Sequence, residues 1–155
     1  MDLRQALETE TVAHVGFPAP VTIQQEQPVK RAIERMKRRR VGCILVLSGE
    51  QLVGIFTERD LVKRVLGQRG TMELPISELM TANPVVARSD EMIHEVLGRF
   101  LRRGMRHLPV LDADDRPVGT LSVRRAVQFL SDHHSNTVYN LPPTFNQVPT
   151  ALGGG

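Results

Sequence analysis

Two short stretches of the sequence carry hydroxyl, carboxylate and basic side chains of the types that bind a sugar phosphate. In the first, GIFTERD, the hydroxyl of Thr57 stands three residues before the carboxylate of Asp60; the second is the adjacent pair Arg106 and His107. An ionised carboxylate accepts hydrogen bonds from neighbouring hydroxyls, as a ribose offers, whereas arginine and histidine donors suit phosphate. If the fold brings the two stretches together, they form a ribonucleotide site.

A local alternative also accounts for Thr57 and Asp60. GIFTERD is expected to run from the end of a strand into the first turn of a helix, where outward-pointing backbone N–H groups favour an anion or a polar ligand. The spacing Thr-x-x-acid is also that of a capping box, in which the two residues only close the helix end. From these residues alone, a cap without a ligand and a cap within a ligand site both stay open.

An internal repeat organises the chain. The segment CILVLSGEQLVGIFTERD, from Cys43, aligns without gaps with LPVLDADDRPVGTLSVRR, from Leu108, and helical apolar stripes precede both copies. The repeated unit is strand, helix, strand, strand, helix. A single copy is marginal as an independent core. We therefore predict an α+β fold of two β-α-β-β-α repeats packed as one pseudo-twofold module.

The expected boundaries follow from apolar periodicity and turn residues. In the first copy we expect strands at 21–23, 41–47 and 52–56 and helices at 28–39 and 58–66. The tail holds three prolines and a glycine run, and is expected to be flexible, although Val138, Tyr139, Leu141 and Phe145 could strap it across its own module or a second subunit. The predicted domains are an N-terminal helical segment at 1–13, repeats at 14–70 and 71–132, and the tail at 133–155.

The two copies differ where the chemistry would lie. At the second corner, GTLSVRR, Ser122 keeps the hydroxyl but Arg125 replaces the acid, and Val41-Gly42 of the first copy matches the basic pair of the second. A site could combine the strand-to-helix corner of one copy with the start of the hairpin in the other copy. Only one of the two such combinations contains both the acid and the basic pair. Apolar strand residues could form the walls around a nucleobase. The candidate ligand-binding residues are Cys43, Ile55, Thr57, Arg59, Asp60, Arg106 and His107, and a second, degenerate site would comprise Val41, Gly42, Ser122 and Arg125.

At these residues the chain resembles the cystathionine-β-synthase (CBS) domain pair, also called a Bateman module. The resemblance covers about residues 12–131 and rests on the repeat, on GIFTERD, on RHLPVLD and on ISELMTANPVV. It implies an adenosine-nucleotide sensor in which Asp60 accepts the ribose hydroxyls, Thr57 is a polar contact, and Arg106 and His107 contact the phosphate from the partner repeat. The resemblance also implies a homodimer of two such pairs.

Composition limits the remaining classes of function. The chain has 41% apolar and 24% charged residues and a net charge of +3, as expected of a globular protein, and all but three of its 20 basic residues are arginines. No apolar run is long enough to span a bilayer and the amino end lacks a secretory pattern, so we expect a cytoplasmic protein without membrane contact. The lone Cys43 excludes an internal disulfide.

Catalytic and metal-binding motifs are absent from the sequence. His94-Glu95 begins like the metalloprotease helix motif, but Gly98 stands where the second histidine ligand is required, and His133-His134 has no partner at ligand spacing. We therefore expect a protein that is not an enzyme and has neither a metal site nor a covalent cofactor. Whether Mg²⁺ would accompany a nucleotide does not follow from the sequence.

The leading hypothesis is a regulatory module that binds AMP, ADP, ATP or a related adenosyl ligand between its two repeats and signals to an effector protein in trans. The alternative is a basic interaction module for nucleic acid or an acidic protein, built on helix ends such as Lys37-Arg38-Arg39-Arg40. Bases at a helix end also offset the helix dipole, and interleaved aromatic residues are scarce. Nucleic acid is therefore the less favoured partner.

Overall fold

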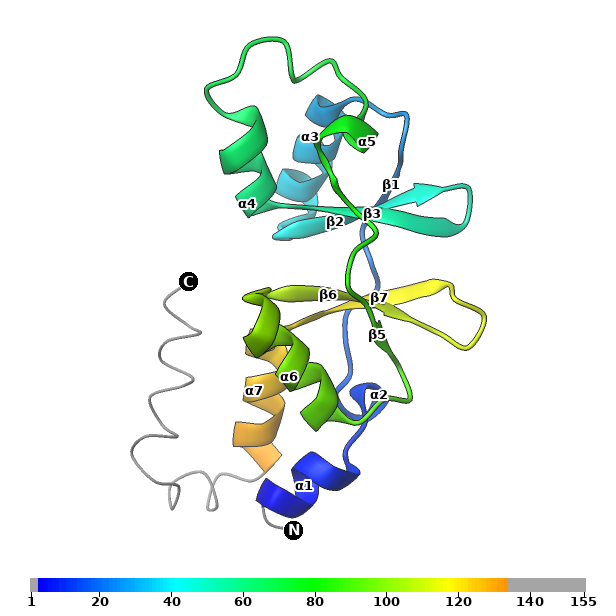
Figure 1. Ribbon diagram of the computed structural model, residues 1–155, viewed down its shortest axis with the longest axis vertical. Helices are drawn as coiled ribbons and strands as arrows, with labels where there is room; N and C mark the ends of the chain where they lie inside the picture. The colour runs from blue at the N-terminus through cyan, green and yellow to red at the C-terminus, as the bar shows by residue number, and fades with distance from the viewer. Residues whose placement is uncertain (1–2, 134–155) are drawn as a thin grey trace. The chain divides into compact units, whose positions relative to one another are not determined.

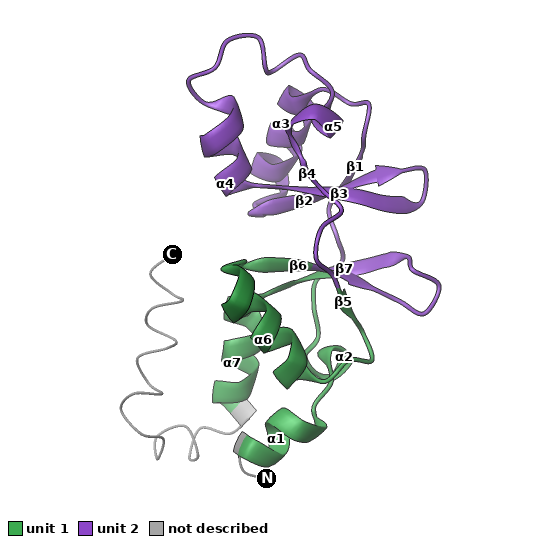
Figure 2. Cartoon of the chain, in the orientation of Figure 1, with its two compact units in different colours: residues 1–18, 87–108, 120–155 green, residues 19–86, 109–119 purple. Residues whose placement is uncertain are grey.

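The computed structural model describes residues 3–133, which group into the two compact units coloured in Figure 2. Among the described residues, unit 2 comprises 19–86 and 109–119, and unit 1 comprises 3–18, 87–108 and 120–133. The amino-terminal residues therefore group with the second repeat. The predicted tail lies outside the described residues, apart from His133 at the end of a helix.

Unit 2 contains the first repeat in the predicted order, and its helices lie on one face of a four-stranded sheet (Figure 1). The sheet order is β1-β2-β3-β4, with β1 parallel to β2 and the other neighbours antiparallel. The predicted helix at 58–66 begins as α-helix and continues as a π-helical turn. The elements are β1 (Thr22–Gln24), α3 (Val29–Arg39), β2 (Cys43–Ser48), β3 (Gln51–Thr57), α4 (Glu58–Asp60), the π turn η1 (Leu61–Val65), α5 (Ile76–Leu79) and β4 (Thr81–Ala82).

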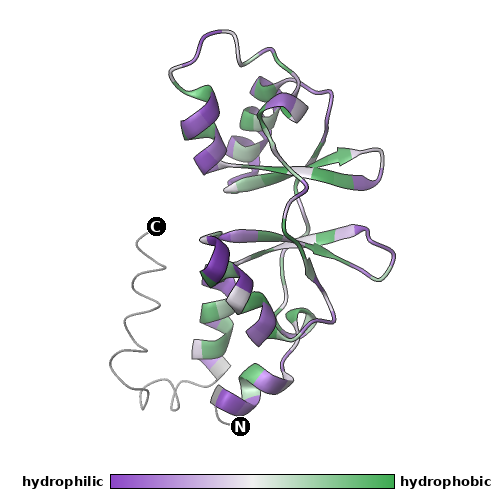
Figure 3. Ribbon diagram, viewed as in Figure 1, coloured by the Kyte–Doolittle hydropathy of each residue, from purple (hydrophilic) through white to green (hydrophobic). Residues whose placement is uncertain are grey.

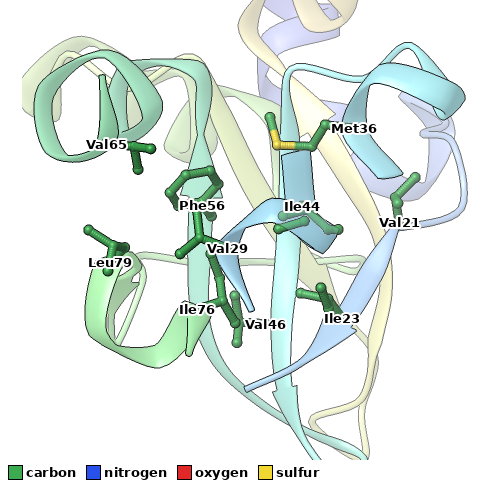
Figure 4. Packing of buried hydrophobic residues seen from close by; sticks show 11 residues of the cluster. Val21, Ile23, Val29, Met36, Ile44, Val46, Phe56, Val65, Ile76 and Leu79 are labelled. Atoms are coloured by element: carbon green, nitrogen blue, oxygen red, sulfur yellow. The ribbon is translucent and has the colours of Figure 1, made fainter. Parts of the chain in front are cut away.

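The core of unit 2 lies between this sheet and its helices. Alternate residues of β2 and β3 face the helices, because side chains alternate across a strand, and the apolar stripe of α3 packs against them. Figure 4 shows Phe56 at the centre of this cluster, with Val65 and Val29 close to it. In Figure 3, β2 and β3 are coloured mainly as hydrophobic, whereas α4 is mainly hydrophilic. Burial of this apolar surface is the main stabilisation of the unit.

A glycine lets the segment after α5 approach β3 closely. A Cβ atom at Gly54 would overlap the side chain of Met80, so a larger residue at this position would force the Met80 side chain to move. In this register Gly54 pairs with Ala82 and Ile55 pairs with Thr81. The close approach therefore places Thr81 beside the strand that carries Thr57.

Unit 1 contains the amino-terminal helices together with helices of the second repeat. Helix α1 packs against α6, and Ala6 and Leu130 form a small buried cluster there. The second sheet has the order β5-β6-β7. These elements confirm the predicted α+β class and the repeated strand-and-helix pattern. They are α1 (Leu3–Thr9), α2 (Val12–Val15), β5 (Ala87–Arg88), α6 (Ile93–Arg103), β6 (His107–Leu111), β7 (Pro117–Ser122) and α7 (Val123–His133), of which residues 109–119 group with unit 2.

A two-pronged ion pair ties α6 to the preceding turn in unit 1. The Arg99 guanidinium donates to both carboxylate oxygens of Glu91, with 2.8 Å between Nη1 and Oε1, and the Arg88 backbone N–H donates to Oε1 at 2.8 Å. The backbone carbonyl of Glu91 also accepts from the Val12 N–H at 3.0 Å, which attaches α2 to the same turn. The hydrogen bond from Arg99 is the main reason that the pKa of the Glu91 carboxyl is lowered from its ordinary value.

Acidification is expected to weaken this turn. Because the pKa of Glu91 is lower in the folded protein than in the unfolded chain, its stabilisation is complete above the unfolded value of about 4.5 and is lost as the pH falls through the folded value. When the pH is lowered from 7 to 3, the free energy of unfolding measured in urea should fall by about 1 kcal/mol less in Glu91→Gln than in the wild type. Glu8→Gln, an exposed acid in α1, is the control and should follow the wild type. The prediction is contradicted if the free energy of unfolding depends on pH in the same way in the wild type and in Glu91→Gln.

Candidate functional site

The first strand-to-helix corner in unit 2 is a complete capping box. The Thr57 hydroxyl accepts from the Asp60 backbone N–H at 3.2 Å, and the Thr57 backbone N–H donates to Asp60 Oδ2 at 3.0 Å. The Thr57 hydroxyl also lies 3.1 Å from the same oxygen and can donate to it. The capping function anticipated from the spacing is therefore present, and it uses Oδ2 of the carboxylate.

The other carboxylate oxygen of Asp60 is held by two residues that the sequence analysis missed. Thr81 Oγ1 donates to Asp60 Oδ1 at 3.2 Å, and Arg64 Nε lies 3.6 Å from the same oxygen. Asp60 is only 7% exposed, so these contacts fix a buried carboxylate in one orientation. The i, i+4 spacing of Asp60 and Arg64 could have indicated their pairing. Thr81 has no such local signal, because the pairing of β4 with β3 brings it there.

Apolar residues of β2 and β3 pair across the strands with Thr57 and Thr81, the two threonines that contact this carboxylate. Cys43 pairs with Thr57 across β2 and β3, and Ile55 pairs with Leu45 on one side and with Thr81 on the other. Cross-strand partners share a face of the sheet, and Cys43, Leu45 and Ile55 form a buried cluster of their own. Unit 2 therefore brings together the predicted residues Cys43, Ile55, Thr57 and Asp60. Arg59 is exposed in the same helical turn.

The predicted basic pair lies in unit 1. Arg106 is exposed directly before β6, and His107 is the half-buried first residue of that strand. The Arg106 carbonyl accepts from the Val123 N–H at 2.9 Å, just as the Gly42 carbonyl accepts from the Glu58 N–H at 3.1 Å in unit 2. The first N–H of each corner helix is thus bound within its own repeat. Because Asp60 and the basic pair belong to different units, their meeting in one site stays a prediction.

The second corner has a different structural use. Ser122 Oγ accepts from the Arg125 backbone N–H at 3.0 Å, so this helix start keeps its cap. The Arg125 guanidinium donates to the Val15 carbonyl at 3.2 Å, at the end of α2. The arginine that replaces the acid of the first copy therefore anchors α2. Val41 and Gly42 are half-buried in unit 2, and the degenerate site that they would share with this corner stays a prediction.

Metal-binding clusters and membrane-spanning helices are both absent from the described part of the chain. Within residues 3–133, no group of three or more histidine, cysteine, aspartate or glutamate side chains could hold a metal ion. No helix in the described part of the chain is long and apolar enough to cross a membrane.

Comparison with known proteins identifies the repeats. The family model named CBS domain matches residues 12–67 and 76–132. A CBS domain-containing protein of Arabidopsis thaliana is 34% identical over 104 residues, which cover 66% of this chain but 19% of that protein, so this chain spans about a fifth of such relatives.

Solved structures share the fold. The crystal structure of the CBS domain NE2398 is 29% identical, with a TM-score of 0.70 over 77% of this chain and 95% of that one. The CBS domain protein PAE2072 from Pyrobaculum aerophilum, complexed with AMP, is 20% identical, with a TM-score of 0.69 over 75% of this chain and 89% of that one. With both repeats matched by the family model, the chain belongs to the CBS-domain family.

Proposed function

We propose that this protein is a regulatory module that binds an adenosine nucleotide, or a related adenosyl compound, at the corner formed by Thr57 and Asp60. The observation that carries the proposal is the buried Asp60 carboxylate, oriented by Thr57, Thr81 and Arg64 beside an apolar strand face. A carboxylate held in this way is suited to accept the two hydroxyls of a ribose. The AMP complex of the Pyrobaculum protein, which has the same fold, supports this choice of ligand.

The roles of the individual residues follow from their charge and polarity. Asp60 accepts the ribose hydroxyls, while Cys43 and Ile55 offer an apolar wall to the base. Arg106 and His107 of the second repeat are proposed to supply donors to the phosphate, because arginine and histidine side chains suit an anion. The exposed Arg59 adds a further positive charge at the corner.

The signal is proposed to act in trans, on an effector protein, through a homodimer of this chain. Support for the homodimer comes from Val62 and Leu66, which are 62% and 60% exposed although both are large and apolar. They stand four residues apart, on η1 and directly after it, so unit 2 exposes two large apolar side chains within one short stretch. Light scattering on the full chain would give the mass of the assembly with and without nucleotide.

Isothermal calorimetry on the full chain tests the ligand assignment. Titrations with AMP, ADP, ATP and S-adenosylmethionine, each with and without Mg²⁺, should give saturable binding for at least one compound. Arg106→Ala should weaken that binding about 10-fold, because a charge-assisted hydrogen bond to phosphate is lost. Arg103→Ala, an exposed base at the end of α6, is the matched control. Absence of binding to all four compounds contradicts the proposal, and unchanged affinity in Arg106→Ala removes the basic pair from the site.

The basic end of α3 supports a second candidate function. Lys37, Arg38, Arg39 and Arg40 are all exposed, and together they form a strongly positive surface at the helix end. Such a surface would bind nucleic acid or an acidic protein with an affinity that falls steeply with salt. That binding would be insensitive to Asp60→Asn, which distinguishes it from nucleotide binding at the corner.

A further inference from the structure

Three hydrogen bonds and one ion pair already engage the Asp60 carboxylate. A carboxylate offers about four lone-pair positions. Oδ2 faces two donors of Thr57, its backbone N–H at 3.0 Å and its hydroxyl at 3.1 Å, and Oδ1 faces Thr81 Oγ1 at 3.2 Å and Arg64 Nε at 3.6 Å. A ribose that donates two hydroxyls to Asp60 therefore competes with a hydrogen bond from Thr81 and with the charge of Arg64 at Oδ1.

The donors on Oδ1 are the ones that can leave at low cost. Loss of the Thr57 backbone N–H bond would leave a partly buried donor unpaired and open the helix cap, which costs stability. Thr81 is exposed, so its hydroxyl can turn to water. The Arg64 side chain is 44% exposed and keeps two other acceptors when it leaves Asp60. Ligand hydroxyls should therefore replace Thr81 and Arg64 rather than Thr57.

Both of these residues connect Asp60 to the end of the first repeat. The Arg64 guanidinium donates to the carbonyl oxygens of Leu79 at 3.2 Å and Met80 at 2.6 Å, where α5 ends. Thr81 begins β4, which has two residues and is held to β3 by the pairs Gly54 with Ala82 and Ile55 with Thr81. The chain then continues into unit 1 at Ala87. Residues 79–82, which we call the exit segment, are thus tied to the proposed ribose acceptor.

We propose that Thr81 and Arg64 are positioning residues that latch the exit segment to Asp60, and that a ribose diol opens this latch by taking Oδ1. The inference rests on the proposed function and adds to it a means of passing occupancy to the chain that leads into the second repeat. In the absence of ligand the latch orients the carboxylate and holds the short strand β4. With ligand bound, the exit segment loses its side-chain attachment to Asp60.

Hydrogen exchange of the full chain, followed by mass spectrometry with and without saturating AMP, tests the latch. In the wild type, AMP should raise amide exchange in residues 79–83 several-fold. Thr81→Val removes the donor with little change in shape, so exchange there should be high without AMP and should not rise further. The same variant should bind AMP about 3- to 10-fold more tightly, because no hydroxyl competes for Oδ1.

Conservative and neighbouring variants separate the latch from a merely structural role. Thr81→Ser keeps the hydroxyl and should restore both the exchange response and the wild-type affinity. Arg64→Gln should raise exchange of the exit segment without AMP, whereas Lys63→Gln, an exposed base one residue earlier, should not.

The possible failures are distinguishable. If the wild type binds AMP but exchange at 79–83 falls or stays constant, or if Thr81→Val binds AMP no more tightly, the latch is wrong while the proposed function stands. If the wild type binds no adenosine compound, the proposed function and the latch are both wrong.

Discussion

Asp60→Asn is expected to weaken the binding of AMP by about 10- to 100-fold. A hydrogen bond to a charged group contributes about 1.5–3 kcal/mol, and each 1.4 kcal/mol is a factor of ten in affinity. Asparagine has one acceptor oxygen in place of two. If that oxygen serves the Thr57 N–H, the amide NH₂ group lies where Oδ1 now faces Thr81 and Arg64. The variant therefore keeps the helix cap but cannot accept a ribose diol, and calorimetry of the full chain measures the loss.

The matched control for this substitution is Glu58→Gln. It makes the same change of charge in the same helical turn, at an exposed side chain. It should bind AMP as tightly as the wild type, so that a loss seen only in Asp60→Asn cannot be assigned to the net charge of the corner. An affinity of Asp60→Asn within twofold of the wild type would show that this carboxylate is only a cap.

Phe56→Ala should lower the free energy of unfolding by about 3–5 kcal/mol. Phe56 is 0% exposed and lies at the centre of the unit 2 core (Figure 4), where truncation removes buried apolar surface and leaves a cavity. It directly precedes Thr57 in β3, so the same packing fixes the corner that carries Asp60. Urea unfolding followed by circular dichroism measures the effect.

Leu101→Ala is the comparison for this core substitution. Leu101 is 52% exposed, and its truncation should change the free energy of unfolding by no more than about 0.5 kcal/mol. A loss below about 1 kcal/mol in Phe56→Ala would mean that the core of unit 2 repacks around the missing ring.

The two corner helices show how one repeated motif has acquired two uses. Both starts keep a hydroxyl cap, from Thr57 in one copy and Ser122 in the other. In the first copy the acid at the third helical position gathers donors from Thr81 and Arg64, whereas in the second copy Arg125 reaches out to the Val15 carbonyl. A carboxylate accepts hydrogen bonds and a guanidinium donates them. The exchange of Asp60 for Arg125 at this position therefore distinguishes a candidate ligand site from a structural anchor.

The sequence by itself determined the elements and the local chemistry of the first corner. Apolar periodicity and turn residues predicted three strands and two helices of the first repeat to within about two residues, because burial requires one apolar face on each element. The spacing of Thr57 and Asp60 predicted the capping box, since a cap involves only residues close in the chain. The pairing of β2 with β3, joined by a short turn, likewise placed Cys43 and Ile55 on one face.

Only the tertiary structure decided what else surrounds Asp60 and what Arg125 does. Thr81 lies 21 residues from Asp60 in the sequence, and Arg125 lies 110 residues from Val15. Both contacts depend on how separate elements pack, and no local pattern encodes them. The gap left by the missing side chain of Gly54 admits Met80 and so sets β4 against β3. Long-range contacts of this kind are decided by the packing of the whole unit, which a single sequence read along its length does not reveal.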